Sequence, residues 1–258
     1  MICVILQPSY IPWRGYFDLI DRADVFVFYD DVQYDQHGWR NRNRIKTSRG
    51  SEWLTIPIQK QGILSQGMPI CEVRPCWDRP WNRSHWDKLR LAYQGAPYFQ
   101  RYAGLVEPFY QRRDEYLADF TIDLTIRLAR ELGIEHTRFV RSSSLGATGA
   151  KTERLIQVLA GLGATHYISG PSARSYIEPE KFAAAGIGLE YIAYAYPEYP
   201  QLYPPYDPQV SILDLLFMTG PAALANIRAF RGSSTPASSA NRTCPPGDSS
   251  AESALPLP

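Results

Sequence analysis

Two short apolar runs at the start of the chain, residues 1–6 and 25–29, have the length and composition of buried strands. Between them, residues 15–23 carry apolar side chains at a spacing that gives a short helix one packed side. Strand, helix and strand in such close succession form a βαβ unit, in which the two strands pair in parallel. This start therefore predicts an α/β fold built on a mostly parallel sheet.

The rest of the chain continues the pattern. Further strands are predicted at residues 53–58, 70–74, 139–140, 165–171 and 187–194. Helices are predicted at residues 86–93, 98–110, 115–132, 151–162 and 212–218. We expect one α/β domain over residues 1–231, with helices flanking the sheet and a helical middle segment at about 84–133. Residues 232–258 are rich in Ser, Pro, Ala and Gly without periodicity, which predicts a disordered tail.

Polar and aromatic side chains crowd the two segments that follow the first two strands. A buried polar group left unpaired costs about 1–3 kcal/mol, so such crowding indicates that something uses these groups. Ligands of parallel sheets bind outside the carboxyl ends of the strands, and both segments begin there. We therefore expect a binding or active site at this edge of the sheet. The candidates are Gln7, Tyr10, Trp13, Asp30, Asp31 and Gln33.

Asp30 and Asp31 are the best candidates for acid–base catalysis. Adjacent residues on an extended chain point to opposite faces, so we expect one of the two to face the ligand. Two other roles stay open, a salt bridge to nearby arginines and a metal site. The metal site is disfavoured because no further ligands occur at a suitable spacing.

Cations and amides alternate in the stretch that follows, and these residues predict an anion-binding group. Arginine presents a planar fork of donors that matches phosphate or carboxylate. The alternative is an ordinary solvated face. The candidates are Trp39, Arg40, Asn41, Arg42, Asn43 and Lys46.

Two further residues complete the candidate site. His85, at the start of a predicted helix, is a possible general base or simply a surface residue. Ser169 begins a Ser-Gly-Pro turn after a strand, where backbone N–H groups can hold a phosphate or oxyanion. Because no dinucleotide, P-loop or nucleophile-elbow motif occurs, no cofactor is evident.

Charge and hydropathy exclude several classes of protein. The net charge is only +1, which disfavours nucleic acid as a partner. No apolar run reaches the roughly 18 residues of a membrane span, and the start has no basic leader. The four cysteines have no metal-binding or disulfide-rich spacing. These features predict a cytoplasmic protein, and nothing in them sets its oligomeric state.

Several motifs together resemble those of the WbqC-like protein family over roughly residues 2–222. Later parts of the match include His85, a Tyr-Ile-Ser-Gly segment ending at Gly170, and a Ser-Ile-Leu-Asp segment from Ser211. The N-terminal motifs are the more specific, and they read QPSYIPW, GYF, YDDVQY, WRNRN and WLTIP.

The resemblance implies an enzyme of bacterial surface-polysaccharide or secondary-metabolite biosynthesis, in particular a transferase that moves an acyl or aminoacyl group to an amine or hydroxyl. Its substrate would be a small molecule or sugar, either free or presented on a carrier protein. Two other functions remain open: a nucleotidyltransferase-like enzyme, and a non-catalytic binder of a glycan or carrier protein. Binding without chemical change would distinguish the last from the two enzymes.

Overall fold

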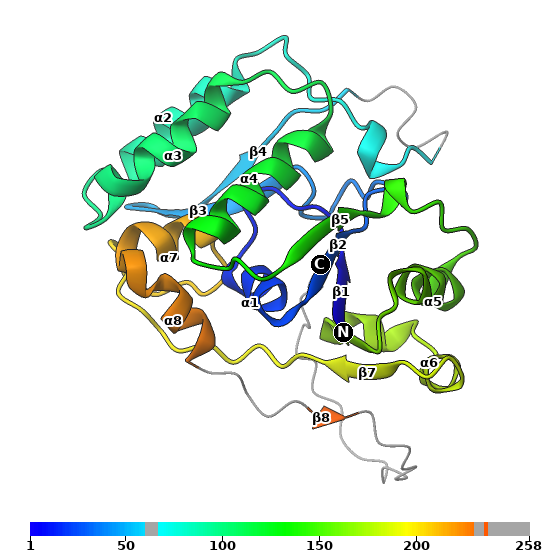
Figure 1. The fold of residues 1–258 in the computed structure, drawn as a ribbon. Coiled ribbons are helices and arrows are strands. Elements are labelled where there is room, and N and C mark those ends of the chain that lie inside the picture. Colours follow the sequence, from blue (N-terminus) through cyan, green and yellow to red (C-terminus); the bar gives the residue numbers. More distant parts are fainter. Residues whose placement is uncertain (60–66, 230–234, 237–258) are drawn as a thin grey trace, which may run out of the picture.

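A sheet of mostly parallel strands, with helices packed on both faces, forms the centre of the protein (Figure 1). The structure, a computed structural model, describes residues 1–59, 67–229 and 235–236. The strands of this sheet are β1 (Ile2–Leu6), β2 (Val25–Phe28), β5 (Arg138–Arg141), β6 (His166–Ser169), β7 (Gly188–Tyr191) and β8 (Thr235–Pro236). The helices are α1 (Arg14–Arg22), α2 (Trp81–Tyr93), α3 (Phe99–Gln111), α4 (Leu117–Glu131), α5 (Lys151–Leu162), α6 (Pro179–Ala184), α7 (Ile212–Thr219) and α8 (Ala223–Arg228).

The order of the strands reverses beside β1. Across the sheet the strands run β5-β2-β1-β6-β7-β8, and all described neighbours pair in parallel except β7 and β8. The chain adds β2 and β5 on one side of β1 and then crosses to add β6 and β7 on the other. In open α/β sheets the ligand binds at the carboxyl ends of the strands where the order reverses. The topology therefore points to the ends of β1 and β6.

Side chains along β1 and β2 alternate between two separate cores, as the two-residue period of a strand requires. Val4, Phe26 and Phe28 pack into the core that contains α1 and α4. Cys3 and Ile5 pack into the core that contains α5 and α6. The sheet is thus buried on both faces, and the α/β fold with a mostly parallel sheet is confirmed.

Outside this sheet, β3 (Arg42–Thr47) and β4 (Gly50–Thr55) form an antiparallel hairpin beside α2 and α7. The hairpin contains most of the cation-and-amide stretch found in the sequence. Strand β3 had not been predicted, because its charged side chains hide the alternation of apolar and polar residues that is typical of a strand.

Two predicted elements were wrong in part. Residues 70–74, predicted as a strand, contain a 3₁₀ turn over Ile70–Glu72, closed by a bond from the N–H of Val73 to the carbonyl of Ile70. The helix predicted from residue 86 begins at Trp81, directly after Pro80, which suits a helix start. Polar residues after Trp81 had hidden the helical period of that first turn. Helix α8 was not predicted.

Two further predictions concern the C-terminal tail and membrane spans. The predicted tail, residues 232–258, lies outside the described residues except for the short strand β8. Within residues 1–59 and 67–229, no helix is long and apolar enough to cross a bilayer.

Candidate functional site

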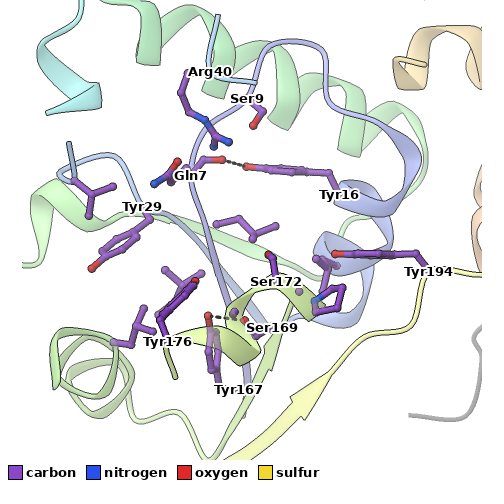
Figure 2. A pocket seen from close by; sticks show the side chains of 18 of the residues that line it. Gln7, Ser9, Tyr16, Tyr29, Arg40, Tyr167, Ser169, Ser172, Tyr176 and Tyr194 are labelled. Atoms are coloured by element: carbon purple, nitrogen blue, oxygen red, sulfur yellow. Dashed lines mark hydrogen bonds between the residues drawn. The ribbon is translucent and has the colours of Figure 1, made fainter. Parts of the chain in front are cut away.

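A pocket of about 490 Å³ lies at the carboxyl ends of β1, β2 and β6 (Figure 2). Gln7 and Ser9 reach it from the loop after β1, Tyr29 from the end of β2, and Ser169 from the end of β6. Helix α5 contributes its first residue, Lys151. The pocket therefore occupies the place that the strand order indicates for a ligand.

Arg40 is a buried cation whose charge no described carboxylate pairs. The side chain is 4% exposed and lines the pocket, and its Nη1 donates to the carbonyl of Pro8 at 3.3 Å. Its Nε has no hydrogen-bond partner within the described chain. Burial lowers the pKa of Arg40, and nearby Tyr16 and Asp35 oppose this effect. Leaving a guanidinium in this state is costly unless an anion supplies the missing acceptor.

Ser9 lies beside Arg40 in the pocket (Figure 2), and we call the end that these two buried residues line the closed end. It is also 4% exposed, and its hydroxyl has no partner within the described residues. Other buried polar atoms lack partners too, but among the described residues only those of Ser9 and Arg40 line this pocket. Two unpaired donors at one closed end predict that an anionic group binds there.

The charge of the whole lining agrees with that prediction. Of the described residues that line the pocket, two are cations, Arg40 and Lys151, and none carries a carboxylate or an imidazole. The other polar contributors are hydroxyls, the indole N–H of Trp13 and one amide, that of Gln7. The pocket opens to solvent near Ser172 and Tyr176, which are exposed. A negatively charged molecule can thus enter at this mouth and place its anionic group at the closed end.

The loop after β1 is held in an unusual conformation by the β3–β4 hairpin. Ile11 has φ of 37°, which is strained for a β-branched residue. The Nδ2 of Asn43 donates to the carbonyls of Tyr10 and Ile11 at 3.1 and 2.9 Å and so fixes this loop. The backbone N–H of Tyr10 also donates to the carbonyl of Trp39. Asn43 and Trp39 therefore support the pocket without lining it.

Trp13 lines the pocket because Gly15 leaves room for its ring. A Cβ atom at Gly15 would lie only 2.4 Å from the Trp13 indole, so a larger residue there would displace the ring. The indole also meets the ring of Tyr194 edge to face, at a centroid distance of 4.8 Å. Of the residues predicted from the sequence, Gln7, Trp13, Arg40 and Ser169 line the pocket.

Asp30 lies outside the lining, fully buried in a clamp that joins the ends of β2 and β5. Its carboxylate accepts hydrogen bonds from the Nε of Arg141 at 2.6 Å, and from the N–H and hydroxyl of Ser143 at 2.9 and 3.0 Å. The carboxylate thus pairs with an arginine, as one sequence alternative proposed, but with Arg141 rather than the 40–46 stretch. This geometry favours a positioning role, and the catalytic role stays a prediction.

Asp31 forms a second clamp next to the first. Its two oxygens accept from the hydroxyl of Ser142 and from Nη2 of Arg154, both at 2.5 Å. The guanidinium of Arg154 in turn lies over the ring of Tyr29, 5.5 Å from its centroid. Tyr29 lines the pocket, so Asp31 helps to fix the position of a lining residue through Arg154.

His85 also lies away from the pocket, on the buried face of α2. Its Nδ1 is 2.9 Å from the hydroxyl of Tyr10, which is 2.7 Å from that of Tyr110. Burial and, to a smaller degree, the charge of Lys88 lower the pKa of His85 to about 4, against the opposing effect of a hydrogen bond with the backbone of Thr55. The imidazole is therefore neutral at pH 7 and hydrogen-bonded within the core.

The low pKa of His85 predicts an acid-sensitive contribution to stability. An unfolded histidine titrates near pH 6.5, so between that pH and about 4 the unfolded state binds more protons than the folded state. The free energy of unfolding should therefore fall by about 2 kcal/mol between pH 7.5 and pH 5 through this residue alone. Urea unfolding at both pH values should show a correspondingly smaller fall for His85→Gln. Exposed His37 supplies the control variant, His37→Gln, and an unchanged fall in His85→Gln would contradict the prediction.

The remaining predicted residues take part in the surrounding structure. Arg42 donates to the carbonyls of Gly38 and His37 and stacks on Trp53, and Lys46 donates to the carbonyl of Pro205. Asn41 donates to the carbonyl of Ile56 at 2.8 Å. Gln33 is exposed beside a separate shallow depression near residues 34–37. Within the described residues, no group of three or more His, Cys, Asp or Glu side chains is placed to bind a metal.

Ser9 and Lys151 are pocket residues that the sequence interpretation missed, and it had weighed Arg40 only as one member of a cationic group. The sequence signal that was available for Ser9 was its position directly after Gln7 and Pro8. Lys151 had been interpreted only as the start of an amphipathic helix.

Comparison with known proteins agrees with the family resemblance of the sequence motifs. The model of the WbqC-like protein family matches residues 7–226. The chain is 40% identical over 229 residues to the uncharacterized protein Rv1507c of Mycobacterium tuberculosis (strain ATCC 25618 / H37Rv), which is 88% of this chain and 97% of that protein. No solved structure matches the chain.

Proposed function

This chain belongs to the WbqC-like protein family, and from its pocket we propose that it is a transferase acting on an anionic small molecule or sugar derivative. The transferred group is an acyl or aminoacyl group, and the acceptor is an amine or hydroxyl. The pathway is bacterial surface-polysaccharide or secondary-metabolite biosynthesis. The observation that carries the proposal is the buried, unpaired guanidinium of Arg40 in a pocket at the point where the strand order reverses.

In this reaction the nitrogen or oxygen of the acceptor attacks the acyl carbon. The new C–N or C–O bond forms, the bond to the leaving group breaks, and the proton of the acceptor passes to the leaving group or to water. Arg40 and Ser9 hold the anionic group of the substrate at the closed end, and Gln7 orients the neighbouring part. Fixed donors and correct positioning supply the rate enhancement, so the lining needs no carboxylate.

Asp30 and Asp31 act as positioning residues in this proposal. They fix the ends of β2 and β5 and, through Arg154, the ring of Tyr29. His85 holds Tyr10 and thereby the loop that carries Ser9.

A turnover assay tests the proposal. The full chain is incubated with acyl phosphates, acyl thioesters and aminoacyl thioesters together with amino and hydroxy acceptors, and products are detected by mass spectrometry. We expect an amide or ester with the wild type and none with Arg40→Met. Binding of donor or acceptor without any product would support the non-catalytic binder instead.

A nucleotidyltransferase-like function is the second candidate, and the reversal of strand order beside β1 favours it, because nucleotides bind at such points. Calorimetry with nucleoside triphosphates distinguishes it. Heat of binding together with release of pyrophosphate would support nucleotidyl transfer, whereas no heat with any nucleotide would remove it.

A further inference from the structure

The mouth of the pocket carries a second group of donors that the closed end does not use. Lys151, Tyr29 and Tyr176 line the pocket and are exposed or half-buried, whereas Arg40 and Ser9 are buried at the closed end. Figure 2 shows Arg40 and Ser9 separated from the two tyrosines. Figure 2 shows the rings of Tyr29 and Tyr176 on the same side of the pocket, and burial raises the pKa of Tyr29. Neither hydroxyl has a hydrogen-bond partner within the described residues.

Lys151 is unpaired although acidic residues lie near it. Glu153 and Glu178 both pair with Lys181 instead, and Lys151 forms no ion pair within the described part of the chain. Its backbone has φ of 49°, an uncommon conformation that holds the residue at the start of α5. The mouth therefore has a cation and two phenol donors available, and no lining carboxylate competes for them.

We infer that the natural substrate carries two separated anionic groups. One binds Arg40 and Ser9 at the closed end, and the other binds Lys151 with the hydroxyls of Tyr29 and Tyr176 at the mouth. The inference rests on the proposed function, because it assigns the second half of the same pocket. The buried, unpartnered atoms of Arg40 and Ser9 establish that the cavity takes a ligand, and the free donors at the mouth give its other end the same chemistry. Phosphorylated carboxylic acids and nucleoside 3′,5′-bisphosphates both meet this description.

Alkane-α,ω-bisphosphonates of increasing chain length measure both ends of the pocket at once, and alkyl monophosphonates of matched length serve as single-ended controls. We expect calorimetry to show one bisphosphonate length that binds at least about tenfold more tightly than its monophosphonate, because the second group binds at high effective concentration. Lys151→Ala should remove this gain and leave monophosphonate affinity within about twofold. Lys151→Arg should retain most of the gain, and exposed Lys88 on α2 supplies the control variant Lys88→Ala.

The results separate the two proposals. If monophosphonates bind through Arg40 but no bisphosphonate gains affinity, or if Lys151→Ala keeps the whole gain, the second subsite is wrong and the first stands. If Arg40→Met binds monophosphonates as tightly as the wild type, the anion site of the proposed function is itself wrong. The gain should also shrink as salt rises, because the mouth is open to solvent. Carboxyalkyl phosphates and nucleoside 3′,5′-bisphosphates then distinguish the two chemical sources.

Discussion

Arg40→Met should strongly weaken anion binding while leaving the protein at least as stable as the wild type. Methionine fills much of the same space, so packing is largely kept. The variant loses charge-assisted hydrogen bonds worth about 2–3 kcal/mol, which is roughly a hundredfold in affinity. It also removes a buried cation that has no ion-pair partner in the described chain, so unfolding should not become easier. Calorimetry with methylphosphonate and urea unfolding measure the two effects.

Arg42→Met is the matched control, because Arg42 belongs to the same cationic stretch but lies outside the lining. It should lose its stacking on Trp53 and keep wild-type affinity for the anion. If Arg42→Met lost affinity and Arg40→Met kept it, the anion site would lie on the hairpin rather than in the pocket.

Asp30→Asn should destabilise the fold more than any other single change to a polar residue of the pocket surroundings. The substitution leaves Arg141 without its buried partner. It also turns one acceptor oxygen into a donor, which then faces either the N–H of Ser143 or the Nε of Arg141 and the hydroxyl of Ser143. Breaking a buried ion pair in this way costs about 3–5 kcal/mol. Urea unfolding should show a lower midpoint with an unchanged slope.

Asp119→Asn provides the control for this variant, since Asp119 pairs with the same Arg141 from a position that is 40% exposed. An exposed pair contributes about 0–1 kcal/mol, so this change should be nearly neutral. Should Asp30→Asn instead keep its stability and lose only turnover, Asp30 would be catalytic, as the sequence had predicted.

The sequence predicted the fold class well because the relevant information is local. Strand, helix and strand over residues 2–28 sit within one short segment, and both strands are apolar along their whole length. The parallel pairing of Cys3 with Val25 then follows from the short helical crossover. The edge of the sheet that holds the pocket could be predicted for the same reason.

The individual site residues were harder to predict, because the partner of a polar side chain comes from distant parts of the chain. Asp30 lies after β2, where the strand pattern placed it. Its partners Arg141 and Ser143, however, lie at and just after the end of β5, far away in the sequence, and they donate hydrogen bonds to its carboxylate. Arg40 lacks such a partner, and no sequence pattern distinguishes it from Arg42. Only the tertiary structure shows which cation remains unpaired.

The most direct test of an anion site at the closed end is a crystal structure of the full chain soaked with tungstate, a heavy-atom analogue of phosphate. The anomalous signal of tungsten locates the anion independently of any assumption about the substrate. We expect a peak within hydrogen-bond distance of the Arg40 guanidinium and the Ser9 hydroxyl, and none in crystals of Arg40→Met. A pocket without a peak in wild-type crystals, with tungstate bound instead along the β3–β4 hairpin at Arg42 or Lys46, would contradict it.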